Sequence, residues 1–243
     1  MTLQIVDIPS PRELRGGWAA LSAVLAAAGL GNFVYADARQ WYYHDGGGNW
    51  ACLRFIGPGR IVLVGHDHEY SETYFRESAA YFGEGETDLL AGAPDWWGTD
   101  IGPSPFGEWI GFVYGWNGQI WQRADYDLND GFTSVGLLKG CSIGGMEGLK
   151  ESAADAPGLD GEDPDAAALS ALIAADGNVT RELLEAAVPG WDIDAGVAAA
   201  RAFLRNESLG VAAPTDHMGE RKYTGPCHSE RRLVRLKCLY KGS

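Results

Sequence analysis

Residues 33–64 read FVYADARQWYYHDGGGNWACLRFIGPGRIVLV, and this run decides the fold. It contains four short aromatic or aliphatic segments, which are typical of β-strands. These segments occupy residues 33–36, 40–44, 50–56 and 60–64. Asp-Gly-Gly-Gly at 45–48 and Gly-Pro-Gly at 57–59 mark turns between them. Because connections this short place successive strands side by side, the run predicts an antiparallel meander.

The residues before this run predict a helix. Ser10 can cap its first turn, Pro11 suits the first helical position, and Glu13 completes a capping box with Ser10. Apolar residues then recur at helical spacing until Gly29, where the helix is expected to end.

Residues 109–126 predict a second hairpin around Asn117-Gly118, a pair that favours a type I′ turn. With this turn, Tyr114 would lie opposite Trp121. One face of the hairpin would carry bulky rings, at Phe112, Tyr114, Trp116 and Trp121. The other would carry mostly small side chains, at Gly111, Val113, Gly115 and Ile120. We expect the first helix to pack on this thin face, because glycine allows close approach.

The fold class predicted is α+β, an antiparallel meander sheet packed on an N-terminal helix with a short C-terminal helical segment. Short helices are also expected at 73–82 and 87–90. The expected divisions are an α+β core at 1–139, an acidic Gly/Ala-rich linker at 140–163, a short helical subdomain at 164–210 and a basic, disordered tail at 211–243. The C-terminal helices are expected at 164–175, 181–188 and 195–205, with Asp163, Thr180 and Asp194 as caps.

Charge limits the classes of partner. The 243 residues carry 19 Lys and Arg against 33 Asp and Glu, a net charge of −14. Residues 215–243 hold seven basic and three acidic side chains, so the rest of the chain carries −18. This charge argues against binding to nucleic acid or to an anionic membrane. The longest apolar run, 18–30, is shorter than a membrane span, and the four scattered cysteines indicate a reduced, cytoplasmic protein.

Gly65-His66-Asp67-His68-Glu69 is the strongest candidate for chemistry. It follows an apolar strand, and two imidazoles with a carboxylate can bind zinc or another divalent metal that activates water. The candidate ligands are His66, His68 and Asp67, with Glu69 as a substitute for Asp67. The simpler interpretation is a solvated loop, because no third histidine lies close in the sequence. A metal-dependent hydrolase is therefore the alternative function.

Asp125, Asp127 and Asn129 resemble the start of an EF-hand calcium loop, since they place oxygen ligands at the first, third and fifth positions. The resemblance then fails, because the glycine comes one place late and Gly136 occupies the position of the bidentate glutamate. An ordinary Asp/Asn turn is favoured.

Residues 33–132 hold 22 of the 27 aromatic residues, and exposed rings are common anchors at protein interfaces. We expect Trp96 and Trp97 to be partly exposed. The predicted partner-binding residues are Trp96, Trp97, Asp95, Trp116 and Glu69. The leading hypothesis is a non-catalytic cytoplasmic protein without cofactor that binds a basic protein partner, as an immunity protein or antitoxin does. Stacking of a sugar or heterocycle on Trp96, Trp97 or Trp116 is a third possibility, and the oligomeric state is left open.

Overall fold

The structure is a computed structural model that describes residues 2–99, 101, 109–137 and 146–205. These residues belong to one compact unit with an α+β fold, as the sequence predicted. The helices are α1 (Pro11–Ala27), α2 (Glu77–Phe82), α4 (Met146–Ala153), α5 (Ala166–Ala174), α6 (Arg181–Ala187) and α7 (Ile193–Ala202). Two 3-10 helices are η1 (Asp95–Gly98) and η2 (Pro157–Leu159).

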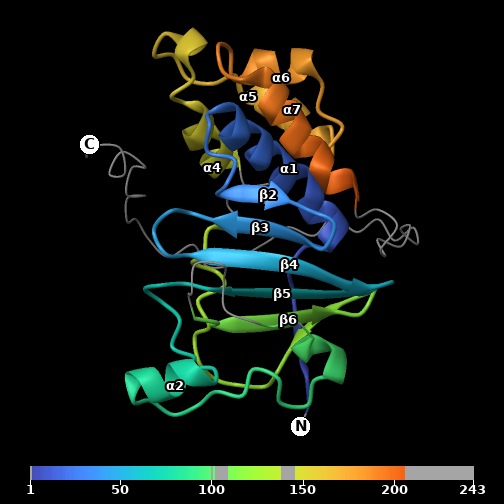
Figure 1. The fold of residues 1–243 in the computed structure, drawn as a ribbon, viewed down its shortest axis with the longest axis vertical. Coiled ribbons are helices and arrows are strands. Elements are labelled where there is room, and N and C mark those ends of the chain that lie inside the picture. Colours follow the sequence, from blue (N-terminus) through green and yellow to red (C-terminus); the bar gives the residue numbers. More distant parts are fainter. Residues whose placement is uncertain (1, 100, 102–108, 138–145, 206–243) are drawn as a thin grey trace. The chain divides into compact units, whose positions relative to one another are not determined.

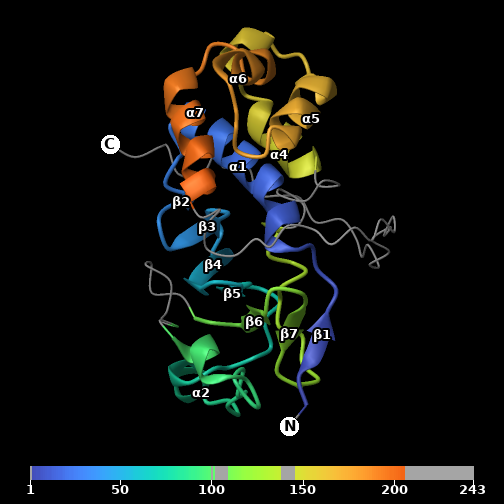
Figure 2. The same cartoon turned by 90° about the vertical axis from the view of Figure 1, so that its right-hand side faces the viewer.

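The sheet of the described residues has seven strands in the order β1-β7-β6-β5-β4-β3-β2, and every neighbouring pair is antiparallel (Figure 1 for β2 to β6, Figure 2 for β7 and β1). The strands are β1 (Gln4–Val6), β2 (Val34–Ala36), β3 (Gln40–His44), β4 (Trp50–Gly57), β5 (Arg60–His66), β6 (Phe112–Trp116) and β7 (Trp121–Arg123). The meander β2 to β5 is confirmed. The edge strand β1 was not predicted, because three residues are too few to show a pattern.

Helix α1 lies between the sheet and the helices α4 to α7, and contributes to one core shared with both (Figure 2). Its capping box is confirmed: the Glu13 N–H donates to Ser10 Oγ at 3.3 Å, and the Ser10 N–H donates to the Glu13 carboxylate at 2.8 Å. Trp18 is fully buried and donates through Nε1 to the Tyr42 carbonyl at 3.2 Å. The helix is therefore covered on nearly all sides.

The prediction that α1 packs on the thin face of the second hairpin is wrong. The core that contains α1 also contains Phe112, Tyr114 and Trp121, so the helix lies on the aromatic side of the sheet, where its main strand contact is with β2. The thin face belongs to a second core on the other side and is covered by η1, where the indole of Trp97 lies so close to Gly115 that a Cβ there would overlap it. The glycine leaves space for this flat ring.

The predicted register of this hairpin is also wrong, by two residues. Trp116 lies opposite Trp121, and Gly118-Gln119 forms the turn. Of these two turn residues, only Gly118 has positive φ, at 96°, and a positive φ at the first central position is the pattern of a type II′ turn. A shift of two residues keeps every side chain on its face, so the division into an aromatic and a thin face is confirmed.

The expected linker contains a helix that the sequence did not indicate. Within the expected linker at 140–163, residues 146–153 form α4, and Leu149 and Ala153 are buried in the same core as α1. The expectation of a loop is wrong there because two apolar side chains one turn apart are enough to anchor a short helix. Thr180 caps α6 as predicted. The observed caps of α5 and α7 are Asp165 and Asp192.

Two further differences concern the segment between β5 and β6. The helix expected at 73–82 begins only at Glu77, and residues 87–90 form no helix. The basic tail expected at 211–243 lies outside the described residues.

Candidate interaction surface

The histidine cluster lies in a tight turn at the end of β5. Asp67 is 1% exposed, and its Oδ1 accepts the N–H groups of Glu69 at 2.9 Å and Tyr70 at 2.7 Å. The Asp67 N–H donates to Ser71 Oγ at 3.0 Å. The carboxylate of Asp67 therefore holds the turn together, as aspartate commonly does after a strand.

The two imidazoles have different surroundings. His66 is half-buried, and its Nδ1 is buried without a hydrogen-bond partner. Burial, and then the nearby imidazole of His68, lower the pKa of His66 to about 4. His68 is exposed, and its N–H donates to Asn49 Oδ1 at 2.7 Å. Among the described residues, no group of three His, Cys, Asp or Glu side chains is placed to hold a metal ion. The predicted zinc site and hydrolase thus have no supporting geometry in this part of the chain.

The low pKa of His66 predicts a loss of stability in acid. The unfolded chain takes up a proton at this imidazole near pH 6.5, whereas the folded chain does so only near pH 4. The unfolded state binds more protons between these values, so the free energy of unfolding should fall by about 2–3 kcal/mol as the pH falls through this window. Urea denaturation of the wild type and of His66→Gln between about pH 4 and pH 6.5 measures this fall in the free energy of unfolding. Equal acid dependence of the two proteins would contradict the prediction.

The loop that resembles a calcium site is fixed by other contacts. The Oδ2 atom of Asp130 accepts hydrogen bonds from the hydroxyls of Tyr114 at 2.6 Å and Tyr126 at 2.8 Å. Arg123 Nη1 lies 3.3 Å from the same oxygen. Burial, and then the charge of Asp130, raise the pKa of Tyr114 and of Tyr126. We call these four residues the Asp130 network.

The candidate calcium ligands of this loop are engaged separately. Asp125 accepts a hydrogen bond from Gln4, and Asn129 Oδ1 accepts the Gly131 N–H at 3.1 Å. Asp125 therefore links this segment to β1, and Asn129 stabilises the turn itself, as asparagine commonly does.

Of the three tryptophans predicted to bind a partner, Trp97 is buried, whereas Trp96 and Trp116 are half-buried, so the expected partial exposure is observed for Trp96. Trp97 is 1% exposed, so the expectation of exposure is wrong for this residue, whose ring fills the space over Gly115. Trp96 is half-buried and packs edge-on against Trp97, with ring centroids 6.0 Å apart. Trp116 is half-buried against Trp121, on the face that α1 covers. These rings contribute mainly to the two faces of the sheet.

The two predicted acidic residues are exposed. Asp95 begins η1, and Glu69 lies in the turn after β5. Both belong to residues 69–95, a segment that carries seven acidic side chains and one basic side chain, Arg76. All seven acids are exposed: Glu69, Glu72, Glu77, Glu84, Glu86, Asp88 and Asp95. This segment therefore forms a strongly negative surface, which attracts cationic partners over long range.

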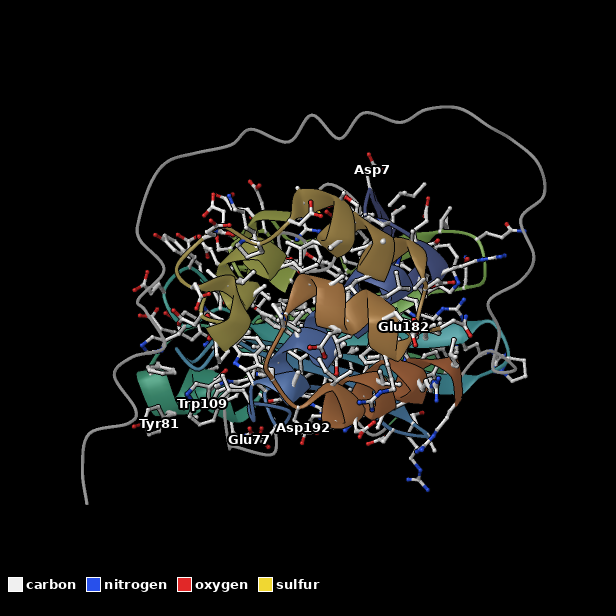
Figure 3. All side chains as sticks on the ribbon, turned by 90° about the horizontal axis from the view of Figure 1, so that it is seen from above. Asp7, Glu77, Tyr81, Trp109, Glu182 and Asp192 are labelled. Carbon is white, nitrogen blue, oxygen red and sulfur yellow. The ribbon has the colours of Figure 1, made fainter. Side chains whose placement is uncertain are left out.

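The sequence missed an aromatic cluster on this surface. Tyr81 is 72% exposed and Phe82 is 49% exposed, and both lie at the end of α2. Trp109 lies against them, with its ring centroid 5.2 Å from that of Tyr81 and 5.9 Å from that of Phe82 (Figure 3). Tyr74 completes the group, 5.6 Å from Phe82. We call these four residues the α2 aromatic cluster.

The exposure of this cluster follows from the short helix that carries it. Ser78 and Ala79 are the buried residues of α2, so its inward positions hold small side chains. Tyr81 and Phe82 come one turn later, directly before Gly83, whose φ of 71° ends the helix. Glu77 lies four residues before Tyr81, which places a carboxylate and a ring on the same side of the helix. The spacing of small and large residues in α2 is a weak signal, because a helix of six residues is too short for it to show which side is exposed.

A cavity of about 330 Å³ in the helical layer is a weaker candidate. Arg12, Glu13, Ser170 and Asp176 are among its lining residues. The carboxylate of Asp176 accepts a hydrogen bond from Arg15 Nε at 2.8 Å, so this group joins α1 to the end of α5. The polar lining thus contributes to helix packing.

Comparison with known proteins adds no identity: no family model, no curated protein and no solved structure matches this chain. Among the described residues, no helix combines the length and the apolar character needed to cross a membrane.

Proposed function

We propose that this protein is a non-catalytic protein-binding protein that holds a basic protein partner against the α2 aromatic cluster and the acidic segment 69–95. An immunity protein or antitoxin that neutralises a basic toxin in the cytoplasm has this combination of properties. The observation that carries the proposal is the exposure of Tyr81 and Phe82, at 72% and 49%, within a segment of seven acids and one base. The proposal requires no cofactor.

The two features would contribute in different ways. Negative charge speeds the encounter with a basic partner and disfavours acidic ones. Buried aromatic anchors supply most of the affinity at protein interfaces, about 2 kcal/mol or more for each central ring. Large apolar rings at the surface are otherwise unfavourable in water, because the apolar area they expose is not buried. Their presence is explained if a partner covers them.

Capture from the native host tests the proposal. The immobilised protein should retain a basic protein at low salt and release it at high salt, because the steering charges are exposed and salt screens them. The double substitution Tyr81→Ser, Phe82→Ser should weaken binding of the purified partner at least about 30-fold, the equivalent of one lost anchor.

Ile5→Ser is the matched control, because Ile5 is 70% exposed on β1, at the edge of the sheet, and should not alter the affinity. Retention that is equal in the wild type and the double variant, or a captured partner that is acidic, would overturn the proposal.

A further inference from the structure

We infer that the α2 aromatic cluster binds arginine side chains, so that the partner presents an arginine-rich segment to this surface. This inference rests on the proposed function and names the chemistry of the partner. On this inference the surface prefers arginine to lysine and to apolar side chains.

The rings of the cluster pack against each other and leave their outer surfaces free. The centroids of Tyr81 and Phe82 lie 4.9 Å apart with their planes at 85°, and Trp109 is in contact with both. Rings at these distances are in van der Waals contact, so there is no space among them for a ligand group. The cluster therefore offers outward ring surface, which suits a flat group that stacks on it.

The charge around the cluster favours a cationic group. Glu77 and Glu84 bracket Tyr81 and Phe82 in the sequence, and both are exposed. A guanidinium group can stack on an aromatic ring while its N–H groups bind a carboxylate in a fork. The ammonium group of lysine is compact and strongly hydrated, and it makes the same contacts less well. An anionic membrane would be repelled by the seven acids of the segment.

The same chain already holds arginine in this way. Arg123 lies over the ring of Tyr126, at 4.2 Å from the centroid, and its Nη1 is 3.3 Å from the carboxylate of Asp130. Arg76 lies over Phe75, at 4.6 Å from the centroid. At the surface we infer the same arrangement as that of Arg123, with an arginine of the partner held between an aromatic ring and a carboxylate but exposed to solvent.

Two synthetic peptides of equal charge test the inference, one with arginine alternating with glycine and one with lysine in place of arginine. Calorimetry should give an affinity about fivefold higher for the arginine peptide, because a guanidinium can stack on a ring and bind a carboxylate in a fork at the same time, whereas an ammonium binds both as a compact, strongly hydrated charge. Amide NMR shifts should map its binding to α2. In the double variant Tyr81→Leu, Phe82→Leu, which keeps apolar side chains but removes the two most exposed rings of the cluster, the preference for arginine should fall. Glu77→Gln, Glu84→Gln should weaken both peptides.

Glu182→Gln on α6 is the matched control, since Glu182 is exposed in the helical layer, away from Tyr81 (Figure 3). It should change neither affinity. Equal binding of the two peptides to the wild type, no binding of either, or arginine preference retained in the leucine variant would each overturn the inference. Equal binding of a neutral peptide with leucine in place of arginine would also overturn it. So would a dimer in sedimentation experiments that Tyr81→Leu, Phe82→Leu dissociates, because a second copy would then cover the cluster. None of these results removes the proposed function if a basic protein is captured through Tyr81 and Phe82.

Discussion

Replacing Asp130 with alanine should lower the free energy of unfolding by about 3–5 kcal/mol, because the change leaves a partly buried Arg123 without its counter-charge. Asp130 is 7% exposed, and its carboxylate accepts hydrogen bonds from Tyr114 and Tyr126. Its second oxygen accepts the Phe132 N–H at 3.1 Å. Loss of the carboxylate removes all these contacts at once, and the buried hydroxyls keep their desolvation cost.

Urea denaturation monitored by circular dichroism measures this loss. Tyr114→Phe removes one hydrogen bond and leaves the ion pair, so it should cost only about 1–2 kcal/mol. If Asp130→Ala lowered the free energy of unfolding by less than Tyr114→Phe does, the Asp130 network would not hold the loop. The Tyr126→Phe variant provides a second comparison of the same kind.

The contact between Trp97 and Gly115 should also have a large effect. Trp97→Ala removes a fully buried indole and should cost about 3–5 kcal/mol. Gly115→Ala should cost about 1–3 kcal/mol on its own, because its methyl group would overlap the indole.

The two substitutions should not be additive. Once Trp97 is an alanine, the added methyl group meets open space, so Gly115→Ala should cost little in that background. A double-mutant cycle measured by urea denaturation gives the coupling directly. Equal costs of Gly115→Ala in both backgrounds would mean that the two residues are not in contact.

The sequence predicted the parts of the fold that depend on local signals. Turn residues at 45–48 and 57–59 locate the strands β3 to β5, and Ser10 and Thr180 mark the starts of α1 and α6. Side-chain alternation also assigned the two faces of the β6–β7 hairpin correctly. These features need only neighbouring residues.

The remaining features depend on contacts between distant segments. Nothing near Gly115 in the sequence indicates that Trp97 covers it, so the position of α1 on the other face could not be derived. The register of the hairpin depends on whether Gly118 is the first or the second central residue of the turn, and both arrangements are common.

The candidate site shows the same limit. The exposure of Tyr81 depends on which side of a six-residue helix faces the sheet, and so short a helix has almost no periodicity. Asp67 was a candidate metal ligand, with an ordinary loop as the simpler interpretation, and its carboxylate accepts hydrogen bonds from the backbone N–H groups of Glu69 and Tyr70. Acidic residues in a turn can serve either role, and only the geometry distinguishes them.

The burial of α1 has a consequence for synthesis on the ribosome. Helix α1 is synthesised more than a hundred residues before α4 to α7, which complete its surroundings and belong to residues 146–202. Until these residues leave the exit tunnel, the apolar side of α1 that they later cover stays open to other chains and to chaperones. Packing of this core is therefore delayed until α7 has been translated.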